Sequence, residues 1–241
     1  MSGLSEKFVA SVAQALNAAH VPCVLWGHYL LTVHGVPSII GSIDFVVPDP
    51  CLQMGAEVLA QFSNLASCSN AACLTSSPER PTPPPSFHVH IKSSEVTVSL
   101  FLQSETLWFL PPLDNRLLPA ENLDLPPSFI LASDTTVLPP WRPGRGSGVF
   151  TSTEIPVVVP KSHILLQAFL LLHARDAWNP ARGFSISMIA YMEECVAADE
   201  LLDANQLPEL LRKLYMELMG GKTPVRQWTK ELQRALGGVV T

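Results

Sequence analysis

The chain has 241 residues, of which 47% are hydrophobic and 15% are charged. This composition supports a folded core and excludes a disordered chain. The net charge of -6 and a pI near 5.6 exclude the non-specific nucleic-acid binding that depends on clustered Lys and Arg. The longest apolar segment, residues 164–173, is too short to span a bilayer, and the N-terminal residues are unlike a secretory signal. We therefore expect a cytoplasmic protein with no membrane contact.

The number and spacing of the cysteines also fit a cytoplasmic protein. The five cysteines form an odd set without a CxxC pair, which argues against a disulfide framework and against a zinc knuckle. We expect reduced thiols at Cys23, Cys51, Cys68, Cys73 and Cys195.

Hydrophobic periodicity predicts alternating helices and strands in the first part of the chain. A helical stripe covers residues 4–19, and a short apolar run at 24–26 predicts a strand. A helix then begins at Gly27 and ends at Gly35 and Pro37, where the chain turns. A second strand is expected at 43–47, and a helix at 51–65.

Proline-rich segments divide the middle of the chain. Residues 66–86 predict a surface loop, and the alternation in 87–91 and 96–102 predicts a β-hairpin. Residues 111–156 are again rich in proline and predict a long irregular connection. Within and just after it, short strands are expected at 129–132 and 155–159.

The remainder of the chain has the pattern of helices. They are expected at 162–175, 186–198, 206–219 and 224–236, with Pro or Gly near their ends. The sequence thus predicts an α+β fold, in which a small mixed sheet flanked by helices occupies 1–159 and a helical region occupies 160–241.

Residues 24–48 resemble the core motif of a known family. A strand ends at Gly27-His28, a helix follows, and the next strand presents Ser42-Ile43-Asp44. This resembles the core of the minimal, abortive-infection-type nucleotidyltransferases, where the strand ends in Gly-Gly or Gly-Ser and the later strand carries Asp-x-Asp. The link His34-Gly35-Val36-Pro37 and the strand-Pro-helix pattern of residues 157–172 resemble the same family.

The resemblance implies a nucleotide cleft lined by Gly27, His28 and Ser42, with Mg²⁺ at Asp44 and Lys161 near the phosphates. A solvated helix N-terminus is the other interpretation of Lys161. The family holds its metal ions with several carboxylates, and here Ser42 replaces the first of them. The family's third carboxylate falls on residues 96–101, where Ser99 or Thr97 stands.

Three functional hypotheses follow. The first is a pseudoenzyme that binds a nucleotide, a small molecule or a protein partner without transferring anything. The second is an enzyme of different chemistry that uses His28 and Asp44 as an acid/base pair, because a carboxylate can hold a histidine that shuttles protons. The third is an active Mg²⁺-dependent nucleotidyltransferase that combines Asp44 with Glu95, Asp49 or a loop acid.

A histidine pair forms the last candidate site. His88 and His90 are two residues apart on an expected strand, so their side chains share a face. Such a pair binds zinc when a third ligand approaches. No Glu or Cys close in sequence completes the set, and we expect a solvated or hydrogen-bonded strand face.

Overall fold

The computed structural model describes residues 4–70, 73–77, 80, 82–118, 125–143, 150–151, 155–177 and 182–237. The chain forms two compact units, the first of residues 1–77 and 84–161 and the second of residues 78–83 and 162–241. Within the described ranges, no helix combines the length and the apolar character needed to cross a membrane.

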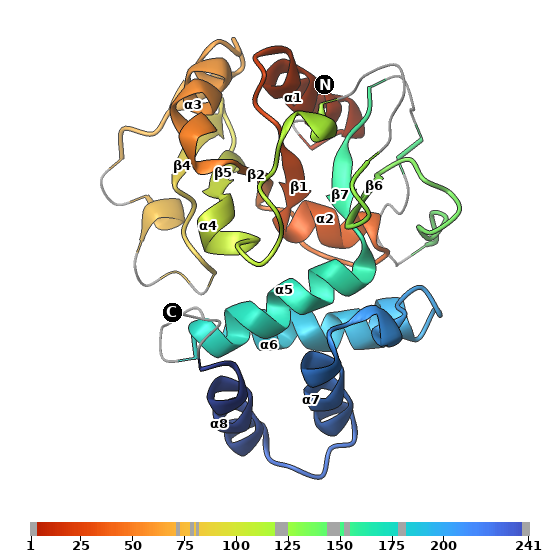
Figure 1. The fold of residues 1–241 in the computed structure, drawn as a ribbon. Coiled ribbons are helices and arrows are strands. Elements are labelled where there is room, and N and C mark those ends of the chain that lie inside the picture. The colour runs from red at the N-terminus through yellow and green to blue at the C-terminus, as the bar shows by residue number, and fades with distance from the viewer. Residues whose placement is uncertain are drawn as a thin grey trace. The chain divides into compact units, whose positions relative to one another are not determined.

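A five-stranded mixed sheet is the centre of the first unit. Its order is β1 (Val24–Trp26), β2 (Ser42–Val47), β5 (Thr97–Leu102), β4 (Phe87–Ile91) and β3 (Leu65–Ser67). Strands β2 and β5 are parallel, and the other neighbours are antiparallel. In Figure 1, β4, β5, β2 and β1 follow one another across the unit. All six residues of β2 are buried, as expected for a strand in the interior of a sheet.

Helices cover the apolar face of this sheet. Helix α1 (Glu6–Ala18) begins at Ser5, whose hydroxyl accepts a hydrogen bond from the backbone N–H of Phe8. Helix α3 (Leu52–Ala60) follows the 3₁₀ turn η1 (Asp49–Cys51) and packs on β4 and β5. A Cβ on Gly55 of α3 would lie 2.9 Å from the Leu100 side chain. Leu100 therefore faces α3, and its neighbour Ser99 faces the other side of the sheet.

A hairpin of β6 (Phe129–Leu131) and β7 (Val158–Pro160) completes the first unit and contacts β1. Helix α2 (Gly27–Val33) leads from β1 toward it. The imidazole of His34, at the end of α2, is buried, and its Nε2 lies 3.0 Å from the carbonyl oxygen of Pro160. A carbonyl only accepts, so His34 carries its proton on Nε2. Short helices α4 (Gln103–Thr106), η2 (Leu74–Ser76) and η3 (Asn115–Leu117) lie in the connections.

The second unit is helical. It contains α5 (Ser162–Arg175), α6 (Arg182–Tyr191) continued by the π-helix η4 (Met192–Ala197), the 3₁₀ turn η5 (Ala204–Gln206), α7 (Glu209–Met219) and α8 (Val225–Leu236). Trp228 of α8 is fully buried and donates from its indole N–H to the carbonyl of Leu214 on α7, at 2.8 Å. A buried indole needs such an acceptor, so this bond sets how α7 and α8 pair.

The predicted α+β class is confirmed, with a mixed sheet and C-terminal helices. The prediction of one helix over 51–65 is wrong at its end. Helix α3 stops at Ala60, and the chain turns at Phe62, whose carbonyl accepts from the N–H of Leu65. Leu65 then begins β3, which the sequence analysis missed because only one of its three residues is buried and no alternation is visible.

The buried His34 predicts a pH-dependent stability. Burial lowers the pKa of His34 from 6.5 to about 4, and the bond to Pro160 opposes this effect in part. Between these values the unfolded chain binds more protons than the native chain, so stability rises with pH. Acidification from pH 6.5 to 4 should cost about 3 kcal/mol through this residue. Denaturant titrations at several pH values measure this slope.

Two variants test whether His34 causes this dependence of stability on pH. His34→Gln keeps an N–H donor for Pro160 but does not titrate, so the slope in this window should fall sharply. His20→Asn replaces an exposed histidine and should leave the slope in place. An unchanged slope in His34→Gln would refute the assignment.

Candidate functional site

The candidate site is built around a close approach between Gly27 and Asp44. Gly27 has a φ of +67°, in the left-handed region, and a Cβ there would lie 2.2 Å from Oδ2 of Asp44. Only glycine fits this position, because any side chain would displace the carboxylate. The pairing of Trp26 with Asp44 across β1 and β2 brings the two residues together. The carboxylate thus packs against the backbone where α2 begins.

Three hydroxyl side chains share the face of β2 and β5 with Asp44. The hydroxyl of Ser42 donates to Oδ2 of Asp44 at 2.8 Å. Across the parallel pair, Ser99 is opposite Asp44 and Thr97 is opposite Ser42. The hydroxyls of Thr97 and Ser99 lie 3.3 Å apart. Ser99 and Thr97 were expected at the place of the family's third carboxylate, and the register puts them beside the Asp44 strand.

This group of four is closed to solvent. The exposed fractions are 5% for Asp44, 7% for Ser42, 2% for Thr97 and 1% for Ser99. A carboxylate that already accepts a hydrogen bond and packs on a backbone is well placed to hold β1, α2 and β2 together. A magnesium ion in proteins keeps several water ligands, so an ion at Asp44 would require this group to open toward solvent.

The other sequence-predicted residues lie around this group. His28 follows Gly27 in α2 and is half-buried. Lys161 is half-buried, and its backbone N–H donates to Ser128 at 3.0 Å. The carbonyl of the adjacent Pro160 accepts a hydrogen bond from His34, so the Lys161 backbone lies near the C-terminal end of α2. Gly27 is at the other end of this helix, about 10 Å away along its axis.

The two acids considered as further metal ligands stand apart from Asp44 in the fold. Glu95 is exposed in the turn between β4 and β5. Asp49 lies in η1, beyond the C-terminal end of β2, and accepts from the backbone N–H of Ser104 at 3.1 Å.

A second polar group lies at the β4 side of the same sheet. One ligand atom from each of Cys68, Cys73, His88 and His90 lies within 4.8 Å of the others. We call these four residues the Cys/His cluster. Sγ of Cys73 lies 3.4 Å from Nε2 of His88 and 3.5 Å from Nε2 of His90. The sequence offered no Glu or Cys close to the histidine pair, and the structure brings two cysteines to it from the connection that precedes β4.

The cluster faces the same side of the sheet as Asp44. In the pairing of β4 with β5, His88 is opposite Ser99 and His90 is opposite Thr97. One row across the sheet thus runs Asp44, Ser99, His88, and the next runs Ser42, Thr97, His90. Strands β2 and β4 are two strand spacings apart, so the two groups are separated by about 10 Å.

Sequence reasoning missed the cysteines because their approach depends on tertiary structure. Cys68 and Cys73 precede the histidines by a long proline-rich connection, and only the unpredicted β3 brings this connection to β4. The available signal was the spacing: C-x₄-C followed by H-x-H. The histidine spacing is shorter than in helical zinc motifs because alternate residues of a strand share a face.

The surroundings of Cys73 favour its charged form. Burial raises the pKa of the thiol, but a hydrogen bond with the Thr75 backbone and one with the Cys68 side chain lower it. The two imidazoles act in the same direction, and the pKa falls to about 6. All five cysteines are free thiols in this structure.

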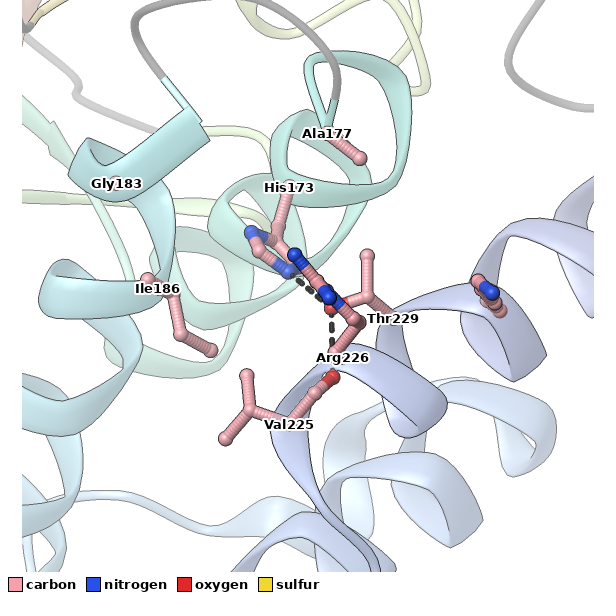
Figure 2. Close-up of a pocket in the computed structure, with 8 residues that line it drawn as sticks. His173, Ala177, Gly183, Ile186, Val225, Arg226 and Thr229 are labelled. Carbon is pink, nitrogen blue, oxygen red and sulfur yellow. Dashed lines mark hydrogen bonds between the residues drawn. The ribbon is translucent and has the colours of Figure 1, made fainter.

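The helical unit contains a separate pocket of about 420 Å³ (Figure 2). Thr229 donates its one hydroxyl proton to the carbonyl of Val225, so Nε2 of His173 donates to Thr229, at 2.9 Å. The imidazole also stacks on Trp228, with ring centroids 5.6 Å apart. Through these contacts, His173 packs α5 against α8. Exposed Arg226 and Lys230 complete the lining.

No protein-family model matches the chain, and neither a curated protein nor a solved structure matches it at a significant level. The two polar groups on the sheet are therefore the features from which a function can be inferred.

The contact between Gly27 and Asp44 gives a stability prediction. Gly27→Ala places a left-handed alanine in the chain, which costs about 1–2 kcal/mol, and drives a methyl group into the carboxylate, which costs a further 1–3 kcal/mol or so. Urea titration of the variant measures the sum.

Gly221→Ala is the matched control, since Gly221 has a similar φ of +63° but nothing within 4 Å of its Cβ position. It should show only the backbone cost. Equal losses in the two variants would mean that Asp44 moves aside freely and does not fix the strand.

Proposed function

We propose that this chain has a nucleotidyltransferase-like core that has lost metal-dependent nucleotidyl transfer and acts as a pseudoenzyme. It binds a nucleotide, a small molecule or a protein partner at the rim of the buried residues around Asp44, where Gly27 and His28 are half-buried, without transferring a group. The observation that carries this proposal is the register of β2 and β5, which gathers Ser42, Asp44, Thr97 and Ser99 as one carboxylate among three hydroxyls.

The connections of the sheet support the resemblance to nucleotidyltransferases. A glycine with positive φ opens the helix between two antiparallel strands, and the second of these carries the acidic residue. The strand with the expected third position lies directly beside it and runs parallel to it. These features fit the family's order of motifs, although three of the polar positions are hydroxyls here.

The side-chain chemistry supports the loss of transfer. Phosphoryl transfer of this type depends on Mg²⁺ that neutralises the triphosphate and orients the attacking oxygen. A single buried carboxylate that already accepts the Ser42 hydroxyl falls short of the several carboxylates with which the family holds its metal ions. The same burial weakens the case for Asp44 as the partner of a catalytic His28, because an external substrate cannot reach the carboxylate.

Calorimetric titration with each nucleoside triphosphate, with and without Mg²⁺, tests the proposal. We expect any heat of nucleotide binding to be unchanged by Mg²⁺, and we expect no transfer of an α-labelled nucleotide to protein or water. The Asp44→Asn variant should bind the same ligands, because its amide oxygen still accepts from Ser42.

Glu95→Gln, which changes an exposed acid in a turn, is the control for charge alone. Mg²⁺-dependent binding that is lost in Asp44→Asn and kept in Glu95→Gln would overturn the proposal and indicate an active metal site.

A gain-of-function variant tests the resemblance separately. Ser42→Asp combined with Ser99→Asp places three carboxylates where the family carries its metal ligands. Without divalent ions the like charges should lower the melting temperature, by several degrees for a loss of about 1–3 kcal/mol. Millimolar Mg²⁺ or Mn²⁺ should restore much of this loss, whereas the unmodified protein should not respond.

Ser94→Asp adds a carboxylate in the exposed β4–β5 turn and should show no response to Mg²⁺. If the double variant responds no more than Ser94→Asp does, the four positions do not form a nucleotidyltransferase metal site.

A further inference from the structure

The Cys/His cluster is brought together by the pairing of β3 with β4. Ala66 is opposite His90 and Ser67 is opposite Val89 in this antiparallel pair. Continuing the register by one residue places Cys68 beside His88. The chain then returns to the same histidines through Cys73, just before η2. Two segments of one connection therefore converge on one strand.

The distances in the cluster match a tetrahedral zinc site. Zinc bonds of about 2.3 Å to sulfur and about 2.0 Å to nitrogen put a sulfur and a nitrogen ligand about 3.5 Å apart. Cys73 lies 3.4 and 3.5 Å from the two imidazole nitrogens. All four ligand atoms lie within 4.8 Å of one another, so an ion needs to draw the set together by only about 1 Å.

The surroundings also suit a metal. Cys73 is buried, and the other three residues are half-buried, so the ligands are held by the fold and are not a loose surface group. The imidazole rings are 5.3 Å apart at a 76° angle, so they are not stacked, and the Nε2 atom of each lies against Sγ of Cys73. Two sulfurs and two imidazoles in a tetrahedral set are the ligands that select zinc.

We propose that Cys68, Cys73, His88 and His90 bind one Zn²⁺ ion as a closed structural site. Four protein ligands leave no open position for a water or a substrate, which distinguishes a structural from a catalytic zinc site. Binding displaces the thiol protons to solvent, and no oxidation or reduction takes place.

A zinc site here would give the connection between β3 and β4 a structural anchor. Between β3 and β4, η2 is the regular element in the described part of residues 68–86. Connections of this length without regular structure are uncommon in compact domains unless they are functional or disordered. A zinc ion bound by Cys68 and Cys73 would attach this part of the connection to β4.

Metal analysis of tag-free protein tests the proposal, because a histidine tag would itself bind zinc. We expect one zinc per chain by mass spectrometry, a lower melting temperature after removal of zinc with a chelator, and recovery when Zn²⁺ is added. Cys73→Ser and His90→Asn should each weaken zinc binding by more than about 100-fold, since loss of a residue that only orients a ligand already costs about 10–100-fold.

Cys51→Ser and His20→Asn are the matched controls, because they change a half-buried cysteine and an exposed histidine outside the cluster. Both should keep one zinc per chain. Equal zinc content in ligand and control variants would overturn the proposal. So would metal-free protein that does not take up added Zn²⁺, or a Cys68–Cys73 disulfide in the purified protein.

A spectroscopic measurement on the unmodified protein covers the case in which ligand variants fail to fold. Co²⁺ in place of zinc should give the intense visible bands of a tetrahedral site, and X-ray absorption should show two sulfur and two nitrogen ligands. A site with only nitrogen and oxygen ligands, or an octahedral Co²⁺ spectrum, would contradict the assignment.

Discussion

The fold of the first unit depends on the approach of the Asp44 carboxylate to the backbone of Gly27. This contact joins three consecutive elements, since Gly27 directly follows β1 and is the first residue of α2, while Asp44 lies in β2. It also explains why residue 27 is glycine, since a side chain there would meet Oδ2 of Asp44 at 2.2 Å. The buried carboxyl group of Asp44 needs a hydrogen-bond partner, and the Ser42 hydroxyl supplies one. The residue that resembles a metal ligand in sequence therefore has a structural role that the sequence pattern alone does not reveal.

The distinction between a transferase and a binding protein depends on how many negative charges converge on one edge of the sheet. The strands that would supply them are adjacent and in register, so the backbone permits a metal site. The side chains do not complete it, because hydroxyls at Ser42, Thr97 and Ser99 are neutral and are bonded to one another or to Asp44. A fold of this kind can keep its connections while its chemistry is lost, because topology depends on apolar burial and reactivity depends on a few polar positions.

The sequence predicted the local elements well and the long-range groups poorly. The strand, helix and strand around Gly27 follow from periodicity and from glycine and proline positions within about 25 residues. Cys68 and His88, by contrast, meet only because β3 pairs with β4, and β3 has too few buried residues to give an alternating pattern. The register that places His88, Ser99 and Asp44 in one row is likewise a property of three strands together, and no segment contains it alone.

The two polar groups lie on one face of one sheet, which raises the question of whether a zinc ion at the Cys/His cluster could supply the positive charge that nucleotidyl transfer would need at Asp44. Its charge argues against this. Zn²⁺ bound by two thiolates and two neutral imidazoles forms a neutral set, so it adds little positive potential for a triphosphate about 10 Å away. Its four ligands also leave no position for a phosphate oxygen. The cluster can therefore attach Cys68 and Cys73 to β4, but it does not supply the metal chemistry that nucleotidyl transfer would need at Asp44.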